Sequence, residues 1–340
     1  MEYDQYILSN KIYNNFCKFY CYGRNNKIKN KLRYEIHNIL ERSLMSIGNL
    51  INSNTNYWLI ISSNDFYKTF YINRIYNDFK EKEDFFAKKI LQDDIEKNIF
   101  PEIDNYYENY TPISDDLSIQ YTDNSIILKD IIIKVNPEIL KSIKQHSNSN
   151  VITMIYRYSS MLLGGQQWGI PFKHYDKLYN NYDVRYEGFT SPLNSRIIRY
   201  TNGKFCSLFY DVDKPFGSIG NFFDIDMLKH NNTGWCINPP YIDELLIKSA
   251  KKCIESIIKA RELKINLFIF FIMPGWFDSI AYEILSTFQF KKYEEILLEN
   301  SYFYEYKNKK IKASFKSVTF VLDSSDKLRN YSDINQYMKF

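Results

Sequence analysis

The sequence predicts an α/β fold with a largely parallel sheet, preceded by a mainly helical N-terminal domain. Three observations predict it. In residues 29–50, apolar side chains recur at spacings of three and four, which is the period of an amphipathic helix. After residue 150, short apolar runs typical of strands alternate with helical patterns, and such alternation favours parallel strands joined by crossovers. The polar segment 147–150 separates the two parts.

The expected boundaries follow from these patterns. We predict a mainly helical N-terminal domain over residues 1–150, an α/β domain over 151–325 and a loosely held C-terminal tail over 326–340. A chain of 340 residues has the length for one large domain or two modest ones. Its 45% hydrophobic and 25% charged residues are ordinary for a globular protein, which argues against wholesale disorder.

In the N-terminal part we expect helices over 29–50 and 65–91, a strand pair over 125–135 and a short helix over 137–145. The strand pair is indicated by its β-branched side chains. The α/β part is expected to alternate between strands and helices. The strands cover 184–189, 235–237, 265–273, 293–298 and 315–322, and the helices cover 151–163, 196–208, 243–263 and 277–288.

Charge and cysteine usage narrow the class of protein. The net charge of +4 permits an anionic partner without requiring one. The five scattered cysteines are typical of a reducing compartment, and no Cys/His cluster indicates a metal. The longest apolar run, 267–273, is far shorter than the ~20 residues that span a bilayer. We therefore expect a soluble intracellular protein without a membrane segment or a metal. Nucleus and cytoplasm both fit, and no feature of the sequence names a protein partner.

The segment that indicates chemistry is Asn238-Pro239-Pro240-Tyr241, which lies between a short apolar strand and an amphipathic helix. In open α/β sheets ligands bind at the carboxyl ends of strands, so this position suits a site. The two prolines fix their own φ and favour extended conformations before them, which stiffens the turn. The structural alternative is a rigid strand-to-helix turn without a catalytic role.

These residue types suit methyl transfer to the exocyclic amine of a nucleobase. The lone pair of such an amine is delocalised into the ring, so the nitrogen needs acceptors for its two N–H bonds. The Asn238 side-chain oxygen and the Pro239 carbonyl are the candidate acceptors. Tyr241 offers a flat face on which a flipped-out base gains ~1–3 kcal/mol by stacking. We predict Asn238, Pro239, Pro240 and Tyr241 as the catalytic residues, which act mainly by positioning.

Five short sequence segments between about Tyr156 and Leu322 are informative when they are taken together, in the order in which they follow one another along the chain. They are Tyr156-Arg-Tyr158 with Leu163-Gly164 and Gln167, Ser191-Pro-Leu-Asn194, Phe216-Gly-Ser-Ile-Gly220 with Asp224, Asn238-Pro-Pro-Tyr241 with Glu244-Leu245, and Pro274-Gly-Trp276. Each block alone is weak. Together they resemble the cap-specific adenosine N6-methyltransferase family of the phosphorylated-CTD-interacting-factor type. Tyr241 stands where that family has Phe, which keeps an aromatic face.

This resemblance implies a Rossmann-like, S-adenosylmethionine-dependent methyltransferase domain. It implies N6-methylation of the 2′-O-methylated adenosine next to the 7-methylguanosine cap of mRNA. S-adenosyl-L-methionine is then the expected cofactor, capped RNA the expected substrate, and the helical N-terminal part a candidate RNA- or cap-binding platform. Long animal members also carry a WW module. The first 160 residues contain a single Trp, Trp58, and lack the two-Trp WW spacing, so we expect no WW domain.

Within this frame, segments that follow strands supply the residues for the methyl donor. We predict Glu187, Pro192, Asn194, Asp224 and Asn238, because an acid near a strand end commonly bonds ribose hydroxyls. For Glu187 the alternative is a solvated strand residue, and for Asn194 it is a turn cap. For Asp224 the alternative is an ordinary surface residue.

For the substrate we predict Arg157, Phe216, Gly217 and Trp276. Arg157 would hold a phosphate, Trp276 would wall the base pocket, and Gly217 permits close approach of the backbone. The alternatives are an ordinary surface or salt-bridged Arg157 and a core Trp276. Two basic stretches, 24–33 and 307–312, carry aromatic neighbours. The second flanks the expected site in sequence and is a candidate RNA-backbone groove, and the alternative for both is a solvated face.

Two other functions stay open at this point. The same chemistry serves an adenine N6-methyltransferase that acts on DNA or on internal RNA adenine, and dependence on the cap separates the two. A catalytically silent, methyltransferase-like subunit that binds RNA as a scaffold is the second alternative. Binding of S-adenosylhomocysteine separates the scaffold from an enzyme.

Overall fold

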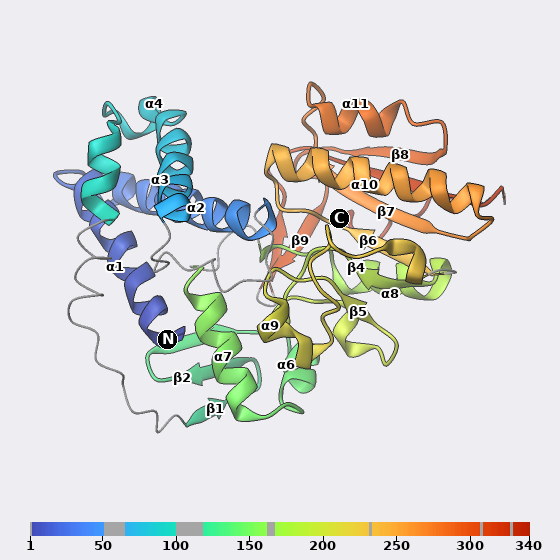
Figure 1. The fold of residues 1–340 in the computed structure, drawn as a ribbon, viewed down its shortest axis with the longest axis horizontal. Helices are drawn as coiled ribbons and strands as arrows, with labels where there is room; N and C mark the ends of the chain where they lie inside the picture. Colours follow the sequence, from blue (N-terminus) through green and yellow to red (C-terminus); the bar gives the residue numbers. More distant parts are fainter. Residues whose placement is uncertain are drawn as a thin grey trace. The chain divides into compact units, whose positions relative to one another are not determined.

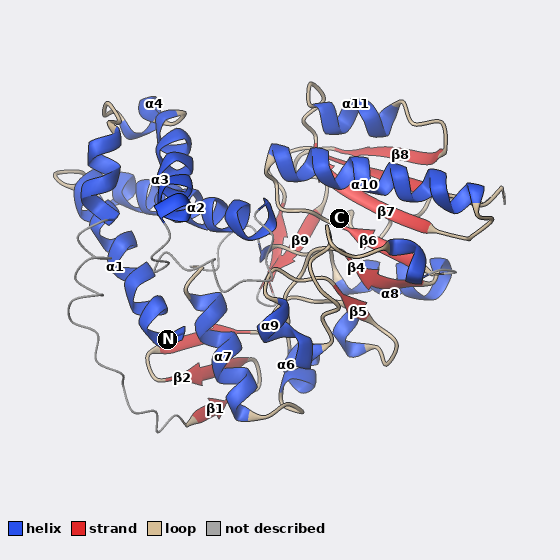
Figure 2. Ribbon diagram, viewed as in Figure 1, coloured by secondary structure: helices blue, strands red, loops and turns tan. Residues whose placement is uncertain are grey.

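The computed structural model describes residues 2–50, 65–99, 118–161, 167–230, 233–306, 309–326 and 329–340. The chain divides into two compact units. One contains Met1–Gln120, Ile127–Ile132 and Asn148–Gln166, and the other contains Tyr121–Ile126, Ile133–Ser147 and Gln167–Phe340. Figure 1 traces the elements along the chain, and Figure 2 shows that helices dominate the first unit whereas the second contains the large sheet. Trp58 lies outside the described residues.

The first unit is mainly helical, as predicted. Its helices include α1 Glu2–Cys21, α2 Asn26–Leu50, α3 Asp65–Lys80, α4 Glu83–Phe86 and α7 Asn148–Ser159. Helix α1 packs against α2 and α7, and α2 packs against α3. Buried aromatic rings from three of these helices stack with centroids 4.9 to 5.1 Å apart, and they are Phe16, Tyr20, Phe79 and Phe86. Burial of these large rings stabilises this unit.

A small sheet and a short helix confirm two further predictions. Strands β1 (Ile119–Tyr121), β2 (Ser125–Leu128) and β3 (Ile131–Lys134) form a three-stranded sheet in that order. Helix α6 (Pro137–Ile143) follows. It begins at Asn136, whose side chain accepts a hydrogen bond from the Glu138 N–H at 2.9 Å. An Asn cap followed by proline at the first helical position is a favoured helix start.

The second unit is built around a six-stranded mixed sheet in the order β5-β4-β6-β7-β11-β8. Its strands are β4 Val184–Glu187, β5 Lys204–Phe205, β6 Gly234–Ile237, β7 Phe268–Pro274, β8 Lys291–Leu297 and β11 Ser317–Asp323. Strands β5, β4, β6 and β7 are parallel, whereas β11 runs antiparallel to both β7 and β8. Strands β9 (Phe303–Tyr306) and β10 (Lys309–Lys312) form a separate antiparallel pair. The predicted α/β class is therefore confirmed.

Helices cover both faces of the six-stranded sheet (Figure 1). Helices α10 (Asp243–Glu262) and α11 (Ile280–Ser286) bury their apolar side chains with Ile269 and Phe271 of β7. On the opposite face, His174 of α8 (Phe172–Tyr182) packs 5.2 Å from the ring of Phe270. This division follows from the alternation of side chains along a strand.

One predicted helix is wrong. Residues 196–208 form a short 3₁₀ turn, Ile197–Arg199, followed by β5. At Gly203 the backbone passes so close to this turn that a Cβ would lie 2.3 Å from the Ile197 carbonyl oxygen. Such close approach requires glycine and turns the chain into the sheet. The other short helical segments of this unit are α9 Tyr210–Asp213 and the 3₁₀ turns Lys214–Phe216 and Met227–His230.

The described residues of the C-terminal segment are held tightly, in contrast to the predicted loose tail. Tyr331, Ile334 and Met338 are buried. The Asn335 side-chain amide donates to the Thr319 hydroxyl of β11 at 2.6 Å. Because most of this segment is polar, the sequence analysis overlooked these regularly spaced apolar side chains, which pack on the sheet.

Candidate active site

The Asn-Pro-Pro-Tyr segment forms an elbow between β6 and α10, as predicted. All four residues of β6 are buried. Pro239 and Pro240 are buried as well, whereas Asn238 and Tyr241 are half-buried. The Pro240 carbonyl accepts a hydrogen bond from the Ile242 N–H at 2.8 Å, which closes the turn immediately before the helix begins at Asp243. The elbow therefore presents two side chains from a rigid, otherwise buried backbone.

This elbow lies where the strand order of the sheet reverses direction. Strand β4 pairs with β5 on one side and with β6 on the other. The connections diverge at this switch point, and ligands of open α/β sheets bind in the crevice that results. The two strand ends adjoin, because the Gly188 N–H donates to the Cys236 carbonyl at 2.9 Å. A Cβ at Gly188 would lie 2.6 Å from Ile237 Cδ1, so glycine permits this close packing.

Glu187, predicted to face the methyl donor, is turned toward its own loop. Its Oε2 accepts hydrogen bonds from the Ser195 hydroxyl at 2.6 Å, the Arg196 N–H at 2.9 Å and the Ile197 N–H at 3.1 Å. Burial raises the pKa of Glu187, and these hydrogen bonds oppose that rise. The predicted alternative of a solvated strand residue is wrong, since Glu187 is 8% exposed. Its observed contacts shape the segment that follows β4.

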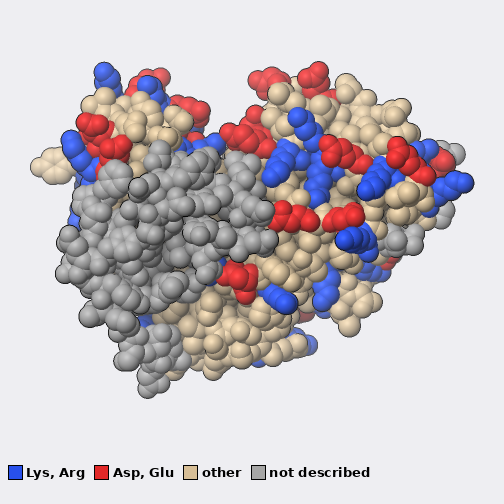
Figure 3. Space-filling model, in the orientation of Figure 1, with Lys and Arg blue, Asp and Glu red and all other residues tan. Residues whose placement is uncertain are grey.

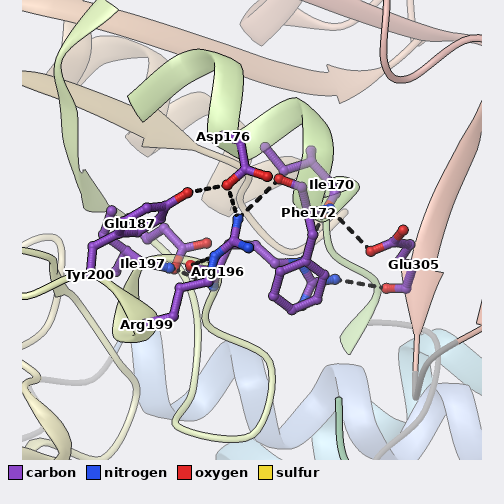
Figure 4. Close-up of polar contacts among 9 residues, drawn as sticks. All are labelled: Ile170, Phe172, Asp176, Glu187, Arg196, Ile197, Arg199, Tyr200 and Glu305. Atoms are coloured by element: carbon purple, nitrogen blue, oxygen red, sulfur yellow. Dashed lines mark hydrogen bonds and ion pairs between the residues drawn. The ribbon is translucent and has the colours of Figure 1, made fainter. Parts of the chain in front are cut away.

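Arg196 is a buried residue of this region that the sequence analysis missed. Its guanidinium donates to the carbonyls of Ile170 at 2.8 Å, Asn194 at 2.7 Å and Glu305 at 3.1 Å. Figure 4 shows it between these segments, with its guanidinium carbon 4.4 Å from the centre of the Phe172 ring. Burial lowers the pKa of Arg196, while the Glu187 and Glu305 charges act against that shift. The available signal was a charged residue two positions after the Ser-Pro-Leu-Asn block.

A second layer of this network involves Arg199. Its guanidinium pairs with the Asp176 carboxylate and donates to the Phe172 carbonyl at 3.1 Å. The Tyr200 hydroxyl donates to the same carboxylate (Figure 4). These contacts join the turn after β4 to helix α8, so the turn is supported from two directions.

The Ser-Pro-Leu-Asn turn is closed by Asn194. Its side-chain oxygen accepts from the Ser191 N–H and the Ser191 hydroxyl, both at 2.8 Å, and from the Thr190 hydroxyl at 2.9 Å. Its amide donates to the Gln167 carbonyl at 3.2 Å. Pro192 is buried in the turn. The structure thus shows the turn-capping contacts that were the alternative to donor contact for Asn194.

Phe216, Gly217 and Asp224 lie beyond β5 along the chain. Phe216 is buried, and its ring lies 4.5 Å from that of His146. Gly217 has φ +103°, a conformation that side chains rarely adopt. The Ile219 N–H donates to the Phe205 carbonyl at 2.8 Å, which holds this loop beside β5. Asp224 is exposed. Among the described residues, no hydrogen bond, ion pair or ring contact joins these three residues to Asn238.

Trp276 follows the carboxyl end of β7, the strand next to β6. Its side chain is 39% exposed, so the alternative of a core tryptophan is wrong. The backbone N–H of Trp276 donates to the Pro274 carbonyl at 2.8 Å, which forms a tight turn at the strand end. Trp276 is therefore presented at the same edge of the sheet as the elbow.

Tyr241 contacts an aromatic cluster that the sequence analysis did not associate with it. Its hydroxyl is hydrogen-bonded to that of Tyr304 in β9, and its ring meets the edge of Phe315 at 5.9 Å. The ring centre of Trp168 lies 6.2 Å from that of Tyr304 and 6.5 Å from that of Phe315. Burial raises the pKa of Tyr241 to about 12, so it stays protonated at neutral pH. The cluster combines segments that are more than 60 residues apart in the sequence.

Arg157 belongs to the first unit. It lies in α7 with 4% exposure, and its carbonyl accepts from the Ser160 hydroxyl at 2.7 Å. It is thus a buried arginine rather than an ordinary surface residue. The sequence placed it on a helix, as found.

Titratable groups elsewhere in the described chain form no further centre. No cluster of three or more His, Cys, Asp or Glu side chains there is arranged to hold a metal ion. The five cysteines are buried and unpaired, and burial raises the pKa of the Cys206 and Cys253 thiols. Figure 3 shows Lys and Arg interspersed with Asp and Glu on the described surface of the face in view. None of the described helices has the length and apolar character needed to cross a bilayer.

Comparisons with known proteins converge on one family. The family model described as the phosphorylated CTD interacting factor 1 WW domain matches residues 134–307, just over half of the chain. An mRNA (2′-O-methyladenosine-N(6)-)-methyltransferase of Mus musculus is 30% identical over 138 residues, and one of Homo sapiens is 27% identical over 135 residues. Each match covers 39% of this chain but 18% of the relative, so the chain spans less than a fifth of these proteins.

The family match corrects one prediction. We expected no WW domain, yet the matching model carries that description. The prediction relied on the two-Trp spacing and on the first 160 residues, whereas the match covers residues 134–307. The matched region includes β4, β6, α10 and β7.

Proposed function

Since the chain belongs to the family of the phosphorylated CTD interacting factor 1 WW domain, we propose that it is an mRNA (2′-O-methyladenosine-N6-)-methyltransferase. The proposed reaction moves a methyl group from S-adenosyl-L-methionine to N6 of the 2′-O-methylated adenosine beside the 7-methylguanosine cap. The names of the two curated relatives support this assignment. The observation that carries it is the Asn238–Tyr241 elbow at the switch point of the sheet.

We propose that the second unit is a Rossmann-like methyltransferase domain. Four parallel strands with a reversal between β4 and β6 support this, as does the placement of helices on both faces. Such a sheet leaves a crevice at its carboxyl edge, where both the donor and the base would lie.

The residues at this edge fit S-adenosyl-L-methionine. When bound, that cofactor supplies a methyl group on a positively charged sulfur, and it brings an ammonium group and ribose hydroxyls that need acceptors. The exposed Asp224 carboxylate and the half-buried Asn238 amide offer such acceptors. Glu187, Pro192 and Asn194 serve the donor by holding the segment after β4, because their observed contacts are with that segment.

The elbow then performs the positioning that amine methylation requires. Asn238 Oδ1 and the Pro239 carbonyl accept the two N–H bonds of the adenine amine, which directs the nitrogen lone pair at the methyl group. The buried prolines keep these oxygens in place, so little ordering is left for the reaction itself. Tyr241 and the exposed Trp276 provide aromatic faces for the flipped-out base.

For the RNA, we propose contacts in both units. Arg157, Phe216 and Gly217 remain candidates because they lie within the family blocks. In the first unit, most of the basic stretch 24–33 lies in α2, and the neighbouring Tyr22 is 89% exposed. Basic and aromatic side chains together suit a single-stranded nucleic acid.

The decisive experiment uses matched short RNAs that begin with 2′-O-methyladenosine, with and without the 7-methylguanosine cap. We expect incorporation of a labelled methyl group at N6 of the capped RNA and little on its uncapped partner. Equal rates on both, or transfer to internal or DNA adenine, would overturn the cap assignment. If S-adenosylhomocysteine does not bind at millimolar concentration in calorimetry, the protein is a scaffold and not an enzyme.

A further inference from the structure

A chain of hydroxyl groups leads from the elbow into the core of the second unit. The Tyr241 hydroxyl is hydrogen-bonded to that of Tyr304, which lies 3.1 Å from Ser317 Oγ. The Tyr302 hydroxyl lies 2.7 Å from the same Oγ and 2.9 Å from the Phe315 carbonyl oxygen. Strands β9 and β11 are thereby connected to the segment after β6.

Tyr302 is the donor in two of these contacts. Its hydroxyl donates to Ser317 Oγ and to the Phe315 carbonyl, which can only accept. In the contacts of Tyr304 with Tyr241 and with Ser317, either hydroxyl can be the donor.

Burial makes these hydrogen bonds costly to lose. Tyr302, Tyr304 and Ser317 are all buried, and an unmade hydrogen bond in such a site costs the desolvation of the polar group. Burial also raises the pKa of Tyr302 and of Tyr304, so both hydroxyls keep their protons at neutral pH. The network is therefore neutral.

We propose that Tyr304 and Ser317 are positioning residues that fix the Tyr241 ring. The edge-on contact with Phe315, at an interplanar angle of 86°, holds the same ring from the side. This inference rests on the proposed function, in which Tyr241 stacks on the target base.

The test is a double-mutant cycle with Tyr241→Phe and Tyr304→Phe. Both variants delete one end of the same hydrogen bond, so we expect the double variant to raise KM for capped RNA no further than Tyr304→Phe alone. That rise should be roughly five- to tenfold, as expected for one hydrogen bond. The Kd for S-adenosylhomocysteine should not change, because the donor does not depend on the ring.

The matched control is Tyr331→Phe. Tyr331 is also buried and donates to Asp323 of β11 at 3.0 Å, outside the network. Its removal should lower the thermal midpoint as Tyr304→Phe does but leave KM for RNA at the wild-type value. A wild-type KM in Tyr304→Phe, or fully additive effects in the cycle, would overturn the proposal.

The same cycle measured by urea unfolding separates two failures. If the wild-type protein transferred no methyl group to any RNA, the proposed function would fail. Coupled unfolding effects of Tyr241→Phe and Tyr304→Phe would then still support the hydrogen-bonded network that holds the Tyr241 ring, and additive ones would refute it.

Discussion

The carboxylate of Glu187 accepts a hydrogen bond from the backbone N–H of Arg196 at 2.9 Å, so the strand end and the turn after it are joined directly. Arg196 extends this connection through its guanidinium to the Ile170 and Glu305 carbonyls. One buried acid and one buried base therefore hold three separate segments that surround the carboxyl ends of β4 and β6. We expect the stability of these segments to depend on this connection.

Replacing Arg196 tests that dependence. Arg196→Lys should lower the free energy of unfolding by about 2–4 kcal/mol, because a single ammonium cannot serve three carbonyls and leaves buried acceptors unpaired. Urea unfolding measures the effect. Arg261→Lys is the matched control, since Arg261 lies near the surface with Ser324 and Asp326 as partners, and should cost less than ~1 kcal/mol. Equal stability of the two variants would contradict a structural role for the Arg196 fork.

Asn238→Ala should abolish methyl transfer while the protein stays folded. The substitution removes the side-chain acceptor for the amine but leaves the buried prolines and the helix start in place. Label transfer to capped RNA and thermal unfolding are the two measurements. The control is Asn180→Ala on the exposed side of α8, which should retain full activity. Wild-type turnover in Asn238→Ala would refute the proposed role in holding the amine.

Gly188→Ala should lower kcat by more than its effect on the free energy of unfolding explains. The added Cβ would lie 2.6 Å from Ile237 Cδ1, and Ile237 directly precedes Asn238. The flexible end of Ile237 can move aside at a cost of about 1–3 kcal/mol, but the strand end then shifts. Single-turnover kinetics together with urea unfolding separate the two effects. An unchanged rate constant in a destabilised variant would show that the elbow tolerates this displacement.

Acid should destabilise the protein through His174. This side chain is fully buried, and neither ring nitrogen has a hydrogen-bond partner in the described chain. Burial lowers the pKa of His174 to about 3, whereas the unfolded chain titrates near 6.5. The unfolded state thus binds more protons below about pH 6.5, and stability falls as the pH drops toward 3. Between about pH 8 and about pH 5 the loss should be about 2 kcal/mol.

The His174→Phe variant checks this assignment. It removes the titrating group and keeps an aromatic ring beside Phe270. Urea unfolding at both pH values should show that most of this acid sensitivity has disappeared. If the variant retained the wild-type pH dependence, other groups would be responsible.

The basic stretch of α2 provides a test of RNA binding by the first unit. Lys27 and Lys31 are exposed and one helical turn apart. Their double replacement by Glu should raise KM for RNA and reduce the salt dependence of binding by about 1.4 in log–log slope, if each lysine neutralises one phosphate. Lys89→Glu with Lys97→Glu makes the same charge change at exposed positions elsewhere in the unit. Identical effects of both pairs would indicate a general charge effect rather than a contact.

The elbow and its flanking elements were accessible from sequence because their signals are local. The apolar run before Asn238 and the helical period after Tyr241 need no knowledge of distant segments, and β6 and α10 lie where these patterns predict. The start of β7 at Phe268 rather than at residue 265 is a modest difference of the kind common at element ends.

The contacts of individual polar side chains were less accessible. Glu187 and Asn194 follow or end a strand-to-turn segment, which also describes residues that face a ligand. Their actual partners are N–H groups of the folded loop, whose direction no pattern reveals. Arg196 and Tyr304 were missed for a related reason. Their partners come from segments that only the completed sheet brings together.

The antiparallel strand β11 has a consequence for biosynthesis. It occupies the interior of the sheet between β7 and β8, yet both neighbours precede it in the chain. While the nascent polypeptide emerges, β7 and β8 expose unsatisfied edges until residues 317–323 leave the ribosome. The last strand of this sheet to be translated is therefore the one that completes its centre, and a stalled chain lacking it would be a client for a chaperone.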